Sequence, residues 1–222
     1  MLATADPHSI SCNLLTAAAH PATISPAMLL QRPRLRNWLH ILYLANPNSG
    51  TYEVELAALV RYASGKRSAL EIGTFEAVST VRIVQAMAPA GVLHCVDPWL
   101  EIGGKPNPCW RIAQRHLRRS DVLSRVRIHR DVAANVRDAI PTELDFAFID
   151  GDHSRKGIET DWAIVAPRIQ PGGIVCLHDS VTPASEPWRM LDSVKYFAEV
   201  IAKDPRFEQL AIVHSLAILQ RR

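Results

Sequence analysis

The segment SALEIGTFEAVST, residues 68–80, decides the fold. It begins with a short apolar run, continues through a glycine at position 73, and then becomes amphipathic. Short apolar runs that alternate with helical stretches of about ten to fifteen residues are typical of βαβ units. Since the same alternation continues along the chain, this segment predicts the first strand and first crossover of a parallel sheet.

Further apolar runs continue the pattern on the C-terminal side. The predicted strands are SALEI, GVLHCVD, RVRIHRD, LDFAFID and GGIVCLHD, and the helices between them cover 78–88, 109–120, 132–139 and 155–167. Nearly continuous apolar strands indicate a parallel sheet that is covered on both faces. After a predicted helix over EPWRMLDSVKYFAEVIA, the runs FEQLAIVH and LAILQ follow too closely for a crossover helix, so we expect an antiparallel hairpin. The predicted fold is α/β: a Rossmann-like, doubly wound, mostly parallel seven-stranded sheet.

The region before residue 66 has a helical pattern but no place in this alternation. We expect an N-terminal arm over 1–30, a first helix over 34–45, and a second helix that ends at Gly65 as its C′ residue. A chain of 222 residues fits one domain. We therefore predict a single domain over 31–222, with a helical lid or cap at 34–65 and a catalytic sheet at 66–222.

Composition narrows the function classes. A formal net charge of +3 is too small and too scattered for a nucleic-acid-binding surface. No apolar run approaches the roughly 18 residues that would suggest a membrane span. The four cysteines lack CxxC spacing, and no Lys or Arg precedes Arg32 as a secretory signal would require. We expect a cytoplasmic protein without nucleic-acid or membrane partners. Formation of a homo-oligomer stays open.

Polar residues follow every predicted strand of the parallel sheet. Ligands of open α/β sheets bind outside the carboxyl ends of the strands, so these residues are the candidates for a site. An acidic residue closes or nearly closes all five strands. The strand ends are LEIGT (70–74), CVDPW (95–99), HRD (129–131), FIDGDH (148–153) and CLHDS (176–180).

The first strand end favours an adenosyl ligand with a positively charged end. It has neither a Walker lysine nor the full G-x-G-x-x-G series of a pyrophosphate site. Glu71 suits a cationic amino group better than a pyrophosphate, and Gly73 allows a ligand to approach the backbone closely. Asp97, at the end of the second strand, is placed to accept hydrogen bonds from ribose hydroxyls.

Four motifs in this order carry a family resemblance over residues from about 50 to 222. They are EIGTFEAVST (71–80), CVDPW (95–99), FIDGDHS (148–154) and PGGIVCLHDS (171–180). The chain resembles class I S-adenosylmethionine-dependent methyltransferases, and among them the metal-dependent small-molecule O-methyltransferases of the methyltransferase 24-like family. One departure is Ala77, which stands where the family usually has glycine.

The resemblance implies a cofactor site for S-adenosylmethionine. Glu71, Gly73 and Ser79 would lie near its methionine moiety, Asp97 at the ribose, Trp99 near the adenine, and Asp131 near the adenine amino group. The same resemblance includes Thr74, Phe75, Pro98 and Asp150 among the cofactor-binding residues.

It also implies a catalytic and metal site for methyl transfer to a hydroxyl of a small-molecule acceptor. Asp150 and Asp179 match the family's metal carboxylates, with His178 as a third candidate ligand, and His153 matches a general base that would act beside Asp150. Oxygen ligands favour Mg²⁺, whereas the nitrogen of His178 leaves Mn²⁺, Zn²⁺ or no metal open. His153 as an N-cap or as a partner of Asp150 also stays open. The alternative functions are an inert adenosyl-binding protein and a nicotinamide-dependent oxidoreductase.

Overall fold

The structure, a computed structural model, describes residue 39 and residues 46–101 and 104–222. The predicted arm and nearly all of the predicted first helix lie outside the described residues. None of the helices in the described part of the chain is both long enough and apolar enough to cross a membrane.

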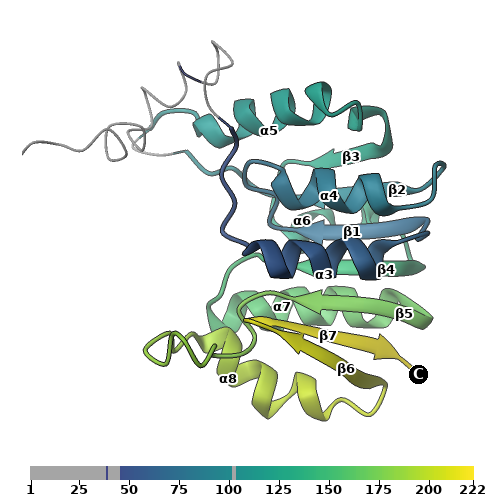
Figure 1. The fold of residues 1–222 in the computed structure, drawn as a ribbon, viewed down its shortest axis with the longest axis vertical. Helices are drawn as coiled ribbons and strands as arrows, with labels where there is room; N and C mark the ends of the chain where they lie inside the picture. The colour runs from purple at the N-terminus through teal and green to yellow at the C-terminus, as the bar shows by residue number, and fades with distance from the viewer. Residues whose placement is uncertain (1–38, 40–45, 102–103) are drawn as a thin grey trace, which may run out of the picture.

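A single sheet runs through the middle of the molecule (Figure 1). Its strand order is β3-β2-β1-β4-β5-β7-β6; β1 to β5 are parallel, and β7 is antiparallel to both β5 and β6. This arrangement confirms the predicted seven-stranded, doubly wound sheet with a terminal hairpin. The strands are β1 Ser68–Ile72, β2 Val92–Val96, β3 Val126–His129, β4 Leu144–Ile149, β5 Ile169–Leu177, β6 Phe207–Val213 and β7 Leu216–Arg221.

Helices cover both faces of the sheet, and each face has its own apolar core. Alternation along β1 divides its side chains between them, with Ala69 on the first face and Leu70 and Ile72 on the second. The first face carries α3 Glu53–Ala63, α4 Val78–Ala86 and α5 Pro108–Arg119, and the second carries α6 Ala133–Val136, α7 Arg155–Val165 and α8 Asp192–Glu199. Short 3₁₀ turns lie at Leu123–Arg125, Arg137–Ala139, Ala166–Arg168 and Ile201–Lys203.

Helix α3 packs into the first core. Its residues Leu56, Leu59 and Ala63 are buried in the first core, beside α4. These side chains complete the layer that covers the sheet, so α3 is part of the core, and a covering role for the region 34–65 stays a prediction. Gly65 follows the helix with φ 71°, as expected of a C′ glycine.

The predicted helix over residues 186–202 is wrong at its beginning, since α8 starts only at Asp192. The ring of Pro187 disfavours a helical backbone at Glu186, which is ion-paired with Arg189 in the loop. The predicted helix over 132–139 is also divided, into one α-helical turn and a 3₁₀ turn.

Candidate active site

Three strand ends meet at the centre of the sheet edge. The backbone N–H of Asp150 donates to the carbonyl of Ile72 at 2.8 Å, and that of His178 donates to the carbonyl of Ile149 at 2.9 Å. The residues that follow β1, β4 and β5 are therefore neighbours in space. Asp150, which follows β4, therefore lies beside the end of β5.

Three residues of the turn between β1 and α4, Gly73, Phe75 and Ala77, have positive φ angles, and two of them explain the sequence there. Gly73 has φ 90°, and a Cβ atom at this position would lie 1.9 Å from the carbonyl oxygen of Asp150. Ala77 has φ 65°, a conformation that costs an L-residue roughly 1 kcal/mol and that glycine adopts freely. The glycine usual at the Ala77 position would relieve this strain.

A cavity of about 600 Å³ opens beside these strand ends. It brings together six of the residues predicted from the sequence: Gly73, Phe75, Asp97, Pro98, Asp131 and Asp150. A smaller adjoining cavity is lined by Thr74 and Ser79 as well as by the segment 48–51. The two cavities share Gly73, Phe75 and Asp150, so they form neighbouring parts of one region.

Asp97 anchors the turn after β1. One of its carboxylate oxygens accepts hydrogen bonds from the backbone N–H groups of Thr74 at 3.0 Å and Phe75 at 2.8 Å, and the other accepts from Trp99 at 2.8 Å. A carboxylate has about four acceptor positions, which leaves capacity for a ligand hydroxyl. Asp131 is arranged similarly, since it accepts from the backbone of Val132 at 2.7 Å.

Two predicted cofactor residues lie apart from the cavities. Glu71 is fully buried and accepts hydrogen bonds from the hydroxyl groups of Ser79 at 2.6 Å and Thr80 at 2.5 Å. Burial raises the pKa of Glu71 to about 7. Trp99 packs against Trp110 with 4.7 Å between ring centroids, and its indole N–H donates to the carbonyl of Phe75. A ligand contact for either residue stays a prediction.

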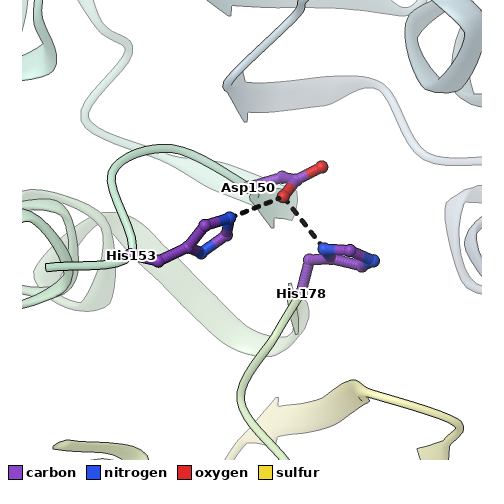
Figure 2. A group of neighbouring side chains, drawn as sticks. All are labelled: Asp150, His153 and His178. Atoms are coloured by element: carbon purple, nitrogen blue, oxygen red, sulfur yellow. Dashed lines mark ion pairs between the residues drawn. The ribbon is translucent and has the colours of Figure 1, made fainter. Parts of the chain in front are cut away.

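A cluster of acidic and histidine side chains lies at the ends of β4 and β5. Asp150, His153 and His178 each offer one ligand atom, and these atoms lie within 4.8 Å of one another. Figure 2 shows the two histidine rings on either side of Asp150. His153 Nε2 lies 3.7 Å from Asp150 Oδ1 and 3.5 Å from Asp179 Oδ2. The four residues that the sequence proposed for catalysis and metal binding therefore converge.

His178 links this cluster to helix α3. Its Nε2 lies 3.1 Å from Glu55 Oε2, and its Nδ1 lies 3.0 Å from Asp150 Oδ1. Burial opposes a charge on His178, but the carboxylates of Asp150 and Glu55 outweigh it and raise the pKa of His178 to about 10. Burial also opposes ionisation of Glu55, yet hydrogen bonds from His178 and Ser215 lower its pKa to about 2.

The loop before α8 holds Asp179 from the other side. Arg189 Nη2 lies 2.7 Å from Asp179 Oδ2, and Arg189 Nη1 lies 3.1 Å from Glu186 Oε2. The hydroxyl of Tyr52 donates to Glu186 at 2.5 Å. The loop and the beginning of α3 are thus joined over the buried carboxylate of Asp179.

Comparison with known proteins identifies the family. A family model described as a methyltransferase domain matches residues 70–180, half of the chain. The chain belongs to this methyltransferase family. No curated protein sequence matches the methyltransferase.

Solved structures share its fold at low identity. Cofactor-bound Rv0187 from MTB is 16% identical with a TM-score of 0.65, and the comparison covers 88% of this chain and 95% of that one. TomG, an O-methyltransferase from Streptomyces achromogenes involved in tomaymycin synthesis and solved with SAM, is 18% identical with a TM-score of 0.62, covering 86% and 89%. An O-methyltransferase from Bacillus cereus, solved with SAH, is 20% identical with a TM-score of 0.60, covering 89% and 92%.

The donor atoms of the cluster fit a divalent cation. Among the described residues, His178 Nδ1 and Asp179 Oδ1 are buried and have no hydrogen-bond partner. Two ligands bound to one ion at about 2.1 Å lie about 3.0 Å apart at right angles and about 3.6 Å apart at trigonal angles. His178 Nδ1 lies 3.0 Å from Asp150 Oδ1 and 3.6 Å from Asp179 Oδ1. A cation bound at Nδ1 would take the place of the proton there.

Sequence reasoning missed several residues of the methyltransferase site. Glu55 lies on the helix that was read as a lid, although its place three residues after the N-cap Tyr52 marks it as a capping-box glutamate. Arg189 lies in a segment predicted as helix. The cavity is also lined by Asp152, which the motif FIDGDHS contains without a predicted role, and by Val132, Ala133, Ala134, Lys156, Thr160 and Asp161, which lie outside the motifs.

Proposed function

We propose that the protein is an S-adenosylmethionine-dependent methyltransferase that acts on a hydroxyl group of a small metabolite with the help of a divalent metal. One observation carries the proposal: Asp150 belongs both to the cavity of about 600 Å³ and to the cluster with His153 and His178. A methyl donor in the cavity and an acceptor hydroxyl at the cluster would therefore meet at this residue.

The cofactor part of the proposal is supported by the polar groups of the cavity. Asp97 and Asp131 follow neighbouring strands and present carboxylate oxygens to it, as the hydroxyls of a ribose and the amino group of an adenine require. Gly73 keeps the turn after β1 close to Asp150. Two fold relatives, the O-methyltransferase TomG and the Bacillus cereus O-methyltransferase, were solved with SAM and with SAH, which favours the same ligand here.

The acceptor part is supported by His153. Its side chain is 34% exposed, and its Nε2 faces the carboxylates of Asp150 and Asp179. An imidazole held in this way can remove the proton of an acceptor hydroxyl as a general base. Placing that oxygen in line with the methyl group would supply much of the remaining rate acceleration.

A metal held by Asp150, His178 and Asp179 would lower the pKa of the acceptor hydroxyl and orient it. Asp179 would remain fixed by Arg189 during the reaction, because this ion pair uses the carboxylate oxygen that faces away from His178 Nδ1. The buried position of the His178 ring restricts its rotation in the same way. These contacts would keep the acceptor in one orientation.

Calorimetry with S-adenosylmethionine and with NAD(P)H tests the cofactor. Binding of the first without the second is expected, and NAD(P)H binding alone would favour the oxidoreductase. Methyl transfer is then followed with radiolabelled S-adenosylmethionine and a panel of hydroxylated small molecules. EDTA should abolish it and added metal should restore it, whereas Asp179→Asn should lose rate and metal dependence together. Tight cofactor binding without transfer to any acceptor would favour the inert adenosyl-binding alternative.

A further inference from the structure

Glu55 is the residue behind the cluster that no family motif contains. It lies on α3, outside the matched residues 70–180, and it is fully buried. Its Oε1 accepts hydrogen bonds from the backbone N–H of Ser215 at 2.9 Å and from the Ser215 hydroxyl at 2.7 Å. Its Oε2 accepts from the backbone N–H of Tyr52 at 2.9 Å and faces His178 Nε2 at 3.1 Å. The carboxylate is therefore held at both oxygens before it meets the histidine.

This contact decides which nitrogen of His178 faces the cluster. Glu55 is an acceptor, so Nε2 must carry a proton to donate to it. The other nitrogen, Nδ1, then points toward the carboxylates, 3.0 Å from Asp150 Oδ1 and 3.6 Å from Asp179 Oδ1, and the residue is buried. Histidines that bind metals usually donate their second N–H to a carboxylate in this way, which fixes both the tautomer and the ring orientation.

The donor set that results is richer in nitrogen than a magnesium site. Mg²⁺ prefers oxygen ligands, whereas imidazole nitrogen suits first-row transition ions. His178 supplies such a nitrogen from a buried ring, whereas His153 keeps its role as the proposed base. The two carboxylates supply the remaining charge.

We propose that Glu55 is a positioning residue that presents His178 Nδ1 to the cluster, and that the resulting site prefers a first-row transition ion such as Co²⁺ or Mn²⁺ over Mg²⁺. The inference rests on the proposed function, because it concerns the same site. It adds the class of metal and a residue from outside the motifs.

The first experiment compares metals in the wild-type protein. The protein is first treated with EDTA and dialysed. It is then titrated with Co²⁺, and in a separate experiment Mg²⁺ is added to the Co²⁺-bound protein to measure how well it displaces Co²⁺. Visible absorption bands of bound Co²⁺ report its coordination. Co²⁺ should bind at least 10-fold more tightly than Mg²⁺, and His178→Asn, which replaces the ring nitrogen by an amide oxygen, should reduce this preference by at least 10-fold. An equal affinity for the two ions, an unchanged preference in His178→Asn, or no Co²⁺ binding would overturn the inference.

The second experiment tests the positioning role. Glu55→Gln places an amide in contact with His178 Nε2, and the loss of an outer carboxylate of this kind typically lowers metal affinity by about 10- to 100-fold. Glu53→Gln is the matched control, since Glu53 lies on the same helix but is exposed and pairs with Arg82. A merely structural role for Glu55 would change stability in EDTA without changing the Co²⁺ spectrum or the preference for Co²⁺ over Mg²⁺. Equal Co²⁺ binding by the two variants would contradict the proposal, and the wild-type and His178→Asn titrations decide it if Glu55→Gln does not fold.

The failure of this inference can be separated from the failure of the proposed function. If S-adenosylmethionine binds and methyl transfer proceeds equally well with Mg²⁺ and Co²⁺, the metal preference is wrong and the methyltransferase activity stands. If S-adenosylmethionine does not bind, the proposed function is wrong whatever the metal titrations show.

Discussion

The two halves of the sheet edge use acidic residues in different ways. At the ends of β2 and β3, Asp97 and Asp131 accept hydrogen bonds from nearby backbone N–H groups. At the ends of β4 and β5, Asp150 and Asp179 face His178, and Asp179 also pairs with Arg189. The first half shapes a cavity for a ligand, whereas the second half concentrates charge.

Two buried glutamates on the same face of the sheet make the contrast clearest. Neither Glu55 nor Glu71 has any exposed surface. The partners of Glu71 are hydroxyl and thiol groups, and burial raises its pKa to about 7. Glu55 faces His178, and its pKa falls to about 2 in spite of burial. The partner, more than the depth of burial, decides which carboxyl carries charge.

The largest expected effect is the difference in stability between the glutamine variants of Glu55 and Glu71. At pH 5 in EDTA, Glu55→Gln should lower the free energy of unfolding by about 3 to 5 kcal/mol, because it removes one of the carboxylates that stabilise the buried charge of His178. Glu71→Gln should change it by no more than about 1 kcal/mol, because Gln resembles the neutral carboxyl that this site favours. Urea denaturation measures both values. Similar losses of stability in Glu55→Gln and Glu71→Gln would show that the two glutamates do not differ in charge.

The pH dependence of stability should separate the sites next. The pKa of Glu71 is raised from 4.5 to about 7 on folding, so its contribution is fully present below pH 4.5 and is lost as the pH rises to 7. At 1.36 kcal/mol for each pKa unit, the loss amounts to about 3 kcal/mol. Wild-type protein should therefore lose stability relative to Glu71→Gln between pH 4.5 and 7. Parallel pH profiles for the two proteins would show that Glu71 is ionised in the folded state.

The sequence predicted the first half of the sheet edge better than the second. The alternation of apolar runs and helices located β1 to β5, and strand ends with Gly73, Asp97 and Asp131 could be assigned to one cavity. These features are local, since a strand, its turn and the following helix lie close together in the chain. Periodicity and turn chemistry are therefore enough to find them.

The second half depends on contacts that no local pattern records. Glu55 and His178 are separated by 123 residues, and Arg189 lies in a loop that has a helical pattern. The packing of Trp99 against Trp110 is a contact of the same kind, because it depends on where α5 lies on the sheet. Pairing across elements is determined by topology and side-chain geometry, which one sequence does not specify.

Asp97→Ala tests whether the sheet edge after β2 and β3 binds the proposed cofactor. The variant should bind S-adenosylmethionine about 1.5 to 3 kcal/mol more weakly by calorimetry, as expected when hydrogen bonds to a charged group are lost. The turn after β1 also loses the acceptor of Thr74 N–H and Phe75 N–H, so part of the loss will come from a less ordered loop. Asp97→Asn keeps one acceptor oxygen and should lose less. Unchanged affinity in both variants would remove Asp97 from the cofactor site.

The smallest expected effect concerns one hydrogen bond of the buried glutamate. Ser79 donates to Glu71 Oε1 at 2.6 Å, and a bond of this kind contributes about 1 kcal/mol to stability. Hydrogen bonds to a charged carboxylate are stronger than those to a neutral carboxyl. Ser79→Ala should therefore lower the free energy of unfolding more at pH 8, where Glu71 is ionised, than at pH 5. The control Ser124→Ala, at an exposed serine, should change it little at either pH. If the cost of Ser79→Ala is the same at both values, Glu71 does not change its charge over this range, and its contrast with Glu55 must be explained by packing alone.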